Sequence, residues 1–198
     1  LSRCRRKVIN ADSVERVRGI EGDAATSYFS VFPHLILNQK ESFVFKGRNR
    51  RPPKDAVNAM LSFVYTLISN DVTAALETVG LDPYVGFMHA LRPGRPSLAL
   101  DIMEELRAYL GDRLVLSLIN RKQITGNQFL QQGDELIIMT DDARRTIISA
   151  WQARKKEQIQ HPFLNEKVSI GLLPHIQAMM LARYLRNDLD DYPVFLIQ

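Results

Sequence analysis

The sequence predicts an all-α, or nearly all-α, protein. Most apolar residues recur at the three- and four-residue spacing of a helix face, and residues typical of helix caps stand before these runs. Only one stretch, 135–139, favours a short strand, and no internal repeat or low-complexity segment is present. With 198 residues, 45% of them hydrophobic and 24% charged, the chain can bury a substantial core.

The first helix is expected to start after Asp12 and Ser13, because short polar side chains there can accept hydrogen bonds from the free amides of the first turn. Its apolar residues are Val14, Val17 and Ile20. Gly19 and Gly22 are poor helix formers, so they predict a break or bend before the helix resumes through residues 28–32.

A strongly apolar helix is expected over 55–69, following a loop over 38–53, with Asp55 as its cap. Its core face comprises Val57, Met60, Leu61, Val64, Leu67 and Ile68. The same helix carries the polar residues Asn58, Ser62 and Tyr65. Such a stripe is more typical of helix-to-helix hydrogen bonding than of the floor of a site.

The remaining chain is expected to alternate helices with loops. Gly80 should end a second helix over 71–79, and Ser97 should cap a helix that runs to about Tyr109. Gly111 and Asp112 should separate that helix from the next one. The other expected segments are a loop over 81–96, a helix over 113–121, a polar loop over 125–134, a helix over 141–156, an irregular stretch over 162–174 and a helix over 176–186.

Composition excludes several classes of protein. One cysteine, Cys4, excludes an internal disulfide framework and a zinc site built from several thiolates. The longest uninterrupted apolar run, 178–182, is too short for a membrane span, and no signal-peptide pattern opens the chain. We therefore expect a cytoplasmic protein. The net charge of +4 comes with basic clusters beside loops, which either form a phosphate-binding face or are scattered solvated surface.

The helix from Ser97 carries the clearest chemical signal. Asp101 and Glu104 are spaced i, i+3, close enough on a helix to bind one cation together, although acidic pairs are often only a solvated face. His89 lies 12 residues before Asp101, across a loop rich in glycine and proline that could return the imidazole to the carboxylates. Glu21, between two glycines, is a further candidate ligand. One histidine and several carboxylates favour Mg²⁺ or Mn²⁺.

Other sites find little support in the sequence. His34, His161 and His175 each stand beside or near a proline without an acidic partner, so we interpret them as structural or surface residues. No glycine-rich phosphate loop and no Gly-x-Ser-x-Gly motif is present. Spacing alone therefore indicates a helical protein that could hold a divalent metal and bind nucleic acid.

Several segments, taken together and in order, resemble a known family. They are 18–25 (RGIEGDAA), 49–63 (NRRPPKDAVNAMLSF), 80–89 (GLDPYVGFMH), 94–107 (GRPSLALDIMEELR) and Asn120-Arg121. This string is similar to the CRISPR-associated integrase-endonucleases that capture new spacers, the first-named Cas proteins. The resemblance covers roughly residues 17–185.

The resemblance implies a metal-dependent DNA endonuclease and integrase. It implies that Glu21, His89 and Glu104 are the metal ligands, with Asp101 as an added acid of the catalytic site and Mg²⁺ or Mn²⁺ as the cofactor. Arg50, Arg51, Lys54, Arg92 and Arg95 are then expected to hold the DNA backbone, since phosphate contacts position DNA without reading its sequence.

The resemblance also bears on domains and partners. Members of the family carry a β-rich N-terminal domain before the helical one, so residues 1–12 are expected to be a linker remnant and 13–198 the helical catalytic domain. The family implies double-stranded and branched DNA, a small ferredoxin-like CRISPR-associated subunit and a homodimer as partners. A non-catalytic helical DNA-binding module, or a scaffold domain, is the alternative.

Overall fold

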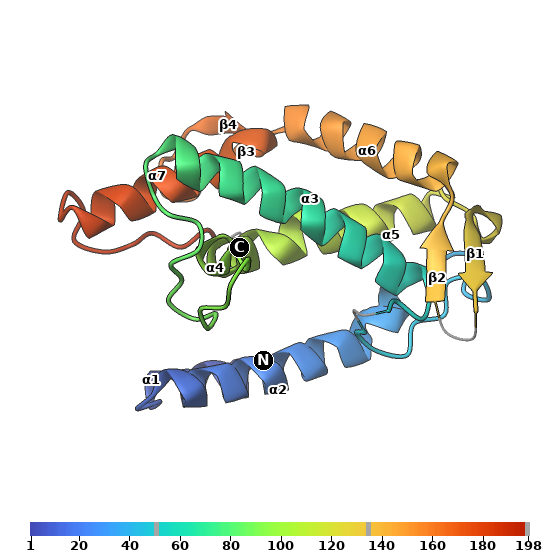
Figure 1. Ribbon diagram of the computed structural model, residues 1–198, viewed down its shortest axis with the longest axis horizontal. Coiled ribbons are helices and arrows are strands. Elements are labelled where there is room, and N and C mark those ends of the chain that lie inside the picture. Colours follow the sequence, from blue (N-terminus) through green and yellow to red (C-terminus); the bar gives the residue numbers. More distant parts are fainter. Residues whose placement is uncertain (50–51, 134–135, 197–198) are drawn as a thin grey trace. The chain divides into compact units, whose positions relative to one another are not determined.

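The computed structural model describes residues 1–49, 52–133 and 136–196, and these are mostly helical (Figure 1). Four short strands also form two antiparallel two-stranded sheets, so the expectation of a nearly all-α protein holds for the bulk of the chain but not strictly. The helices are α1 (Ser2–Ile9), α2 (Val14–Val31), α3 (Ala56–Thr78), α4 (Ser97–Leu106), α5 (Arg113–Asn120), α6 (Asp141–Lys156) and α7 (Leu173–Leu185). The strands are β1 (Phe129–Gln132), β2 (Leu136–Met139), β3 (Gln158–Gln160) and β4 (Lys167–Ser169).

The chain divides into two compact units. Unit 1 comprises residues 1–62 and 115–143, and unit 2 comprises 63–114 and 144–198. The boundaries fall inside α3, α5 and α6. Each unit is described by itself below.

In unit 1, the segment expected to be a linker remnant forms α1, none of whose residues is buried. The helix α2 begins as predicted, with Arg16 N donating to the Ser13 side chain. The predicted break is wrong, because α2 continues through Gly19 and Gly22. Added Cβ atoms there would meet nothing within 4 Å, so the glycines are exposed positions in a helix held by its buried residues Ile20 and Phe29.

Aromatic rings and one amide organise the core of unit 1. Phe29, Phe32 and Phe45 form a cluster with ring centroids 5.2 to 5.9 Å apart, so the loop over 38–53 is anchored by a side chain that reaches the end of α2. The Asn120 side chain accepts from Leu37 N over 2.8 Å and donates to Leu35 O over 2.9 Å. The loop is therefore irregular, but its Phe45 ring is packed in this cluster and Asn38 at its start donates to Asn120 O over 2.7 Å.

The expected strand over 135–139 is present as β2, but the polar loop predicted before it also forms a strand. β1 pairs with β2, with Phe129 opposite Met139. The Phe129 ring lies 5.6 Å from that of Phe43, and this contact decides a strand that its polar sequence did not indicate.

The two helices expected over 55–69 and 71–79 are one helix, α3. Asp55 caps it as predicted, accepting from Asn58 N over 2.7 Å. Asp71, expected to start a new helix, instead accepts a hydrogen bond from Lys155 Nζ over 2.9 Å within unit 2. Gly80, with φ +81°, follows the helix end, where Leu81 N donates to Leu76 O.

Among the described residues, α3 alone is long and apolar enough to cross a membrane. Its apolar side chains are buried within the protein, including Val57, Met60, Val64, Ile68 and Leu76 at 0% exposure. The same burial explains the apolar composition, because a core helix passes the same test of length and hydropathy.

In unit 2, α4 begins at Ser97 and has no side-chain cap, so the expected capping role of Ser97 is wrong. Gly111 and Asp112 do not separate two helices either. They lie in a π-helical turn, Arg107–Asp112, which joins α4 directly to α5. Gly111 packs closely there, since a Cβ would lie 3.0 Å from the Tyr65 ring.

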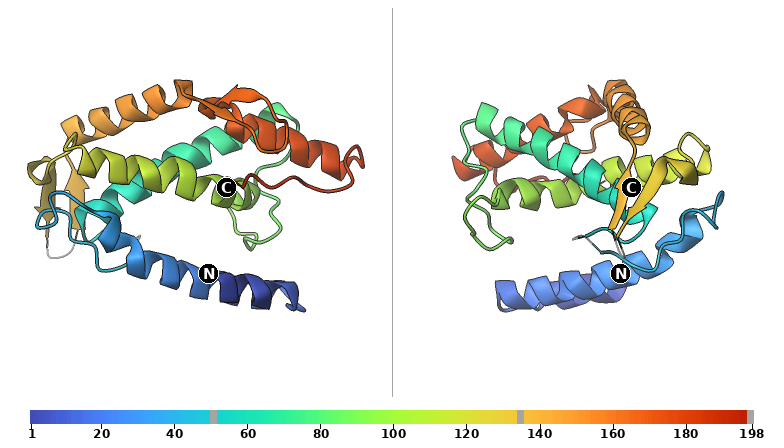
Figure 2. Two further views of the ribbon diagram at one scale, coloured as in Figure 1. Left: turned by 180° about the vertical axis from the view of Figure 1, so that it is seen from behind. Right: turned by 45° about the vertical axis from the view of Figure 1, so that its right-hand side comes forward.

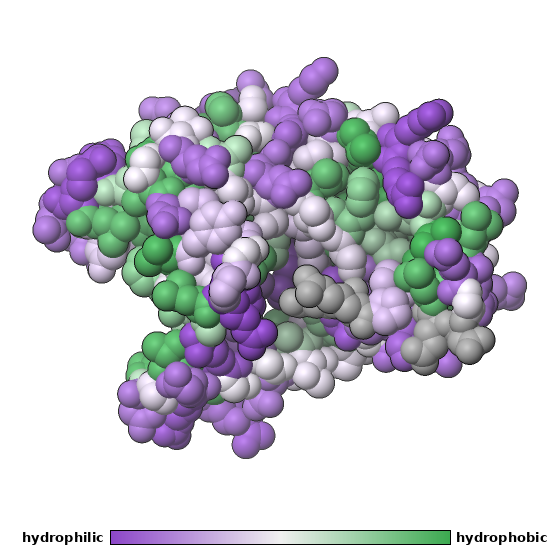
Figure 3. Space-filling model, in the orientation of Figure 1, coloured by the Kyte–Doolittle hydropathy of each residue, from purple (hydrophilic) through white to green (hydrophobic). Residues whose placement is uncertain are grey.

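The rest of the chain follows the predicted order of helices. Thr140 caps α6, whose surface is largely hydrophilic (Figure 3), and α7 begins three residues earlier than expected. The stretch expected to be irregular contains β4, which pairs with β3. After α7 the chain returns to α4, as the views from both sides show (Figures 1 and 2).

Candidate metal and DNA site

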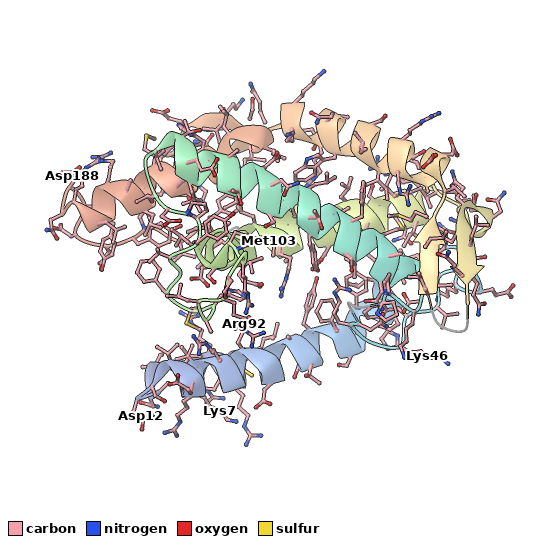
Figure 4. All side chains as sticks on the ribbon, viewed as in Figure 1. Lys7, Asp12, Lys46, Arg92, Met103 and Asp188 are labelled. Carbon is pink, nitrogen blue, oxygen red and sulfur yellow. The ribbon has the colours of Figure 1, made fainter. Side chains whose placement is uncertain are left out.

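The loop over 81–96 is fastened to the first turn of α4. Pro83 O accepts from Leu98 N over 2.9 Å and from Ala99 N over 3.2 Å, which satisfies amides that a helix start leaves free. Ser97 Oγ donates to Ala90 O over 3.0 Å. The loop carries Arg92 and α4 carries Met103 (Figure 4). The predicted loop is thus an ordered attachment to the helix that bears the acidic pair.

Asp101 gathers three consecutive amides of this loop. Its Oδ2 accepts from Phe87 N over 2.6 Å and from Met88 N over 3.0 Å, and its Oδ1 accepts from His89 N over 2.9 Å. The His89 ring adds a fourth hydrogen bond, from Nδ1 to Oδ1 over 2.7 Å. The sequence-predicted approach of His89 to Asp101 is therefore confirmed.

This geometry fixes the chemistry of the His89 ring. An ionised carboxylate only accepts hydrogen bonds, so Nδ1 must carry the proton and Nε2 of the neutral ring has a free lone pair. Metal-binding histidines commonly have their second nitrogen held in this way by a carboxylate. Both carboxylate oxygens of Asp101 thus accept hydrogen bonds from the loop amides and the His89 ring. Asp101 is therefore an orienting residue for His89.

Gly86 permits this close packing. A Cβ on Gly86 would lie 2.7 Å from Ser97 C and 2.8 Å from Asp101 Oδ2, closer than real side chains approach. Only glycine lets the loop backbone reach the carboxylate at this point.

The Asp101 carboxyl is ionised near neutral pH. Burial raises the pKa of its carboxyl, but the hydrogen bonds from the His89 ring and the three amides outweigh burial and lower the pKa below its usual value. The negative charge is therefore permanent near neutral pH, and it keeps the proton of His89 on Nδ1.

Glu104 lies one helical turn beyond Asp101, which places the two Cβ atoms about 5–6 Å apart. Arg107 Nη1 donates to Glu104 Oε1 over 2.6 Å, and the guanidinium lies 5.5 Å from the centroid of the Tyr65 ring. Tyr65 in turn donates to buried Asp112. Arg107 therefore places a positive charge beside the Glu104 carboxylate, and the Tyr65 ring lies beneath the guanidinium.

Sequence reasoning missed Arg107 and Asp112. The i, i+3 spacing of Glu104 and Arg107 could have indicated their pairing, whereas nothing in the sequence brings Asp112 to Tyr65, 47 residues away.

Glu21 lies in unit 1, on the exposed surface of α2. Its carboxylate makes no hydrogen bond or ion pair within the described part of the chain. His89, Asp101 and Glu104 lie in unit 2. In the described ranges no group of three or more histidine, cysteine, aspartate or glutamate side chains is gathered closely enough to hold a metal ion. The convergence of Glu21 with His89 and Glu104 stays a prediction.

The predicted DNA contacts fall in both units. Arg50 and Arg51 lie outside the described residues. Lys54 in unit 1 is exposed, as is Arg92 in unit 2, and Arg95 is half-buried. A DNA-binding role for these five residues stays a prediction.

Arg48, in the same basic run as Lys54, has a structural role. Its guanidinium donates to Asn58 Oδ1 over 2.7 Å and to Ser62 Oγ over 3.1 Å. With Tyr65 bound to Asp112, all three members of the polar stripe on α3 make internal hydrogen bonds. The packing interpretation of this stripe is therefore confirmed.

His161 is a structural residue, as predicted. It is buried, its Nδ1 accepts from the amides of Phe163 and Leu164, and its ring lies 5.7 Å from that of Phe195. Burial lowers the pKa of the imidazole below its usual value.

Comparison with known proteins identifies relatives along nearly the whole chain. A profile described as CRISPR associated protein Cas1 matches residues 1–153. A CRISPR-associated endonuclease Cas1 from Chlorobaculum tepidum is 56% identical over 195 residues, 98% of this chain and 57% of that protein. One from Leptospira interrogans is 53% identical over 186 residues, 94% of this chain and 73% of that protein.

Solved structures agree. A Cas1 protein from Thermotoga maritima has a TM-score of 0.83 at 31% identity, covering 93% of this chain and 56% of that one. A casposase bound to integration product has a TM-score of 0.85 at 24% identity, covering 97% and 55%, a likeness that shows a shared fold. The chain thus spans little more than half of several relatives, and by sequence and fold it belongs to the Cas1 family.

Proposed function

We propose that this chain forms the catalytic part of a divalent-metal-dependent DNA endonuclease and integrase that inserts foreign DNA into a CRISPR array. In the integration step a 3′-hydroxyl oxygen of the foreign DNA forms a bond to a phosphorus of the repeat. The bond from that phosphorus to the repeat's own 3′-oxygen breaks, and the displaced strand leaves with the proton as a new 3′-hydroxyl. Relatives at 50–56% identity that are named Cas1 endonucleases support this proposal.

The observation that carries the proposal is the His89–Asp101 pair. The ring is held by its Nδ1 and by the amide of its own residue, which leaves Nε2 as the nitrogen that would bind a cation in this proposal. The half-buried Asp101 carboxylate accepts one hydrogen bond from the imidazole and three from loop amides, which is more than a solvated acidic face requires.

The donor types suit Mg²⁺ or Mn²⁺, with His89 and Glu104 as ligands and Glu21 as the third. A divalent cation held there would supply positive charge to stabilise the negative charge that develops on the phosphoryl oxygens and on the leaving 3′-oxygen. The chain's own residues orient the donors: Asp101 fixes the tautomer and rotation of His89, and Arg107 fixes the Glu104 carboxylate.

The basic residues hold the DNA in this proposal. Arg50, Arg51, Lys54, Arg92 and Arg95 bind phosphates of double-stranded and branched DNA without reading bases. One similar solved structure is a Cas6-RT-Cas1–Cas2 complex, with a TM-score of 0.86 at 27% identity, covering 100% of this chain and 21% of that one. It supports assembly with a Cas2-type subunit, for which we propose the small ferredoxin-like form, together with a homodimer in the prokaryotic cytoplasm.

The test is cleavage of a branched DNA by the protein with Mn²⁺, comparing His89→Ala with His34→Ala, a control at an exposed histidine. We expect His89→Ala to abolish cleavage and His34→Ala to retain it, both with unchanged helical content. Cleavage by His89→Ala would overturn the metal-ligand role. Salt-sensitive DNA binding without cleavage by any variant would instead favour a non-catalytic DNA-binding module.

A further inference from the structure

Glu105, the residue after Glu104 on α4, accepts hydrogen bonds from three donors that come much later in the chain. The Tyr192 hydroxyl donates to Oε1 over 2.6 Å. Phe195 N and Gln177 Nε2 donate to Oε2 over 2.9 and 2.8 Å. All of these residues belong to unit 2. The proposed chemistry uses none of them.

Gln177, fully buried on α7, contacts both the Glu105 carboxylate and the residues Tyr192 and Pro193. Its Nε2 lies 3.0 Å from the Tyr192 hydroxyl and 3.2 Å from Pro193 O, in addition to the Glu105 carboxylate. The residues 192–195, named here the tail segment, are thus tied both to α7 and to the last turn of α4.

The tail segment also inserts one ring into the core. Phe195 is 2% exposed, whereas its neighbours Val194 and Leu196 are 47% and 70% exposed. Its ring lies 6.0 Å from that of Tyr109, in the π-helical turn that follows α4, and 5.7 Å from that of His161. Phe195 therefore contacts the turn that directly follows α4, the helix that carries Glu105.

The contact restrains the rotation and the axial position of α4. Glu105 fixes one side of the last helical turn, and Phe195 fixes the turn that follows it. Since Glu104 is the adjacent residue and Asp101 lies one turn earlier, a small rotation of α4 would displace both carboxylates. A half-buried carboxylate with three directed donors specifies this register more sharply than an apolar contact of the same size, which tolerates sliding.

We propose that Glu105 is a positioning residue which, by binding the tail segment, holds α4 in the register that the Glu104 and Asp101 carboxylates require. The structural part of this proposal stands on the contacts of Glu105, Tyr192 and Phe195. Its catalytic consequence rests on the proposed function.

The first test is hydrogen exchange of the whole protein followed by mass spectrometry, in Tyr192→Phe and Phe195→Ala. The controls are Tyr184→Phe, at a partly exposed tyrosine of α7, and Leu196→Ala. We expect exchange in 97–112 to accelerate about tenfold in Tyr192→Phe, as for loss of one hydrogen bond to a charged group, and more in Phe195→Ala. Exchange in α2, in unit 1, should not change. Unaltered exchange in 97–112, or equal acceleration across the chain, would overturn the proposal.

The second test measures the Mn²⁺ concentration that gives half-maximal cleavage of branched DNA. We expect Tyr192→Phe to raise this concentration while approaching the wild-type rate at saturating Mn²⁺, and Tyr184→Phe to leave it unchanged. An equal half-maximal concentration in Tyr192→Phe would remove the catalytic consequence. If the wild-type protein cleaves nothing, the proposed function fails, and the exchange result still decides whether the tail segment holds α4.

Discussion

Asp101 and Glu105 lie about one turn apart on α4, and each accepts several hydrogen bonds, yet their pKa values shift in opposite directions. Burial raises both, but at Asp101 the His89 ring and three amides more than compensate, so its pKa falls. At Glu105, burial outweighs the hydrogen bonds from Tyr192, Phe195 N and Gln177, so its pKa rises. Depth of burial and the number of donors together decide which carboxylate is the more stable anion.

The two carboxylates also differ in where their donors come from. Those of Asp101 lie 12 to 14 residues earlier in the chain, whereas those of Glu105 lie 72 to 90 residues later. Asp101 orients a loop that approaches the candidate site, and Glu105 attaches the far end of the chain. One helix therefore binds an earlier loop through Asp101 and a much later segment through Glu105, about one turn apart.

The largest effect on DNA cleavage is expected from Asp101→Asn, which removes the hydrogen bonds on the Asp101 side of this comparison. Asp101→Asn replaces one acceptor oxygen by an NH₂ group that faces donors, so the loop amides and the His89 ring lose their common partner. We expect cleavage of branched DNA to fall about 100-fold or more, the scale of losing an oriented catalytic group. Asp82→Asn, at an acid of the same loop that accepts only from Tyr84 N among the bonds described, should lose little. Near-wild-type cleavage by Asp101→Asn would refute its orienting role.

Gly86→Ala tests the same contact from the loop side. The added Cβ meets Ser97 and Asp101 at under 3.0 Å, and backbone atoms cannot move aside cheaply, so we expect a loss of about 1–3 kcal/mol in unfolding free energy. Gly19→Ala is the matched control, because it adds a methyl group in open space on a helix and should stabilise the protein by up to about 1 kcal/mol. Thermal or urea unfolding measures both, and equal changes would contradict the close packing at Gly86.

His161, beside Phe195, gives a pH test of the tail segment. Its folded pKa lies below the unfolded value of about 6.5, so its contribution to stability is complete above that pH and is lost as the pH falls through the folded pKa. We expect the midpoint of thermal unfolding to fall more steeply on acidification in the wild type than in His161→Gln. His175→Gln is the control. Parallel pH profiles for wild type and His161→Gln would mean that protonation of His161 does not disturb this contact.

The smallest effect on folding is expected from the double variant Arg92→Ala with Arg95→Ala. This variant tests whether the loop before α4 binds DNA. Each phosphate contact contributes about 0.9 to the slope of log affinity against log salt, so the pair should flatten the slope by about two and weaken unrelated duplexes alike. Replacing Arg183 and Arg186, exposed residues at the C-terminal end of α7, should leave the slope unchanged. An unchanged slope in the first variant would place the DNA path elsewhere.

The sequence by itself determined the local parts of this protein. Helix faces follow from apolar spacing, Ser13 and Asp55 cap helices as predicted, and the pairing of His89 with Asp101 spans a short loop whose glycine and proline content permits the return. Gly19 and Gly22 misled the prediction, because propensity is a weak force beside the packing of Ile20 and Phe29, and Asp71 misled it because a cap residue can equally be an ion-pair partner. The correct predictions depend on neighbours within about one or two turns or one loop, whereas the partner of Asp71 is Lys155, 84 residues later.

Only the tertiary structure decided the contacts between distant segments: the strand β1 against Phe43, Asp112 beneath Tyr65, and the tail segment on Glu105. None of them leaves a periodic trace in the sequence, because one buried polar side chain or one inserted ring needs no repeated spacing to find its partner. Their stability comes from burial shared by residues 47 to 90 positions apart, which exists only once the chain has folded.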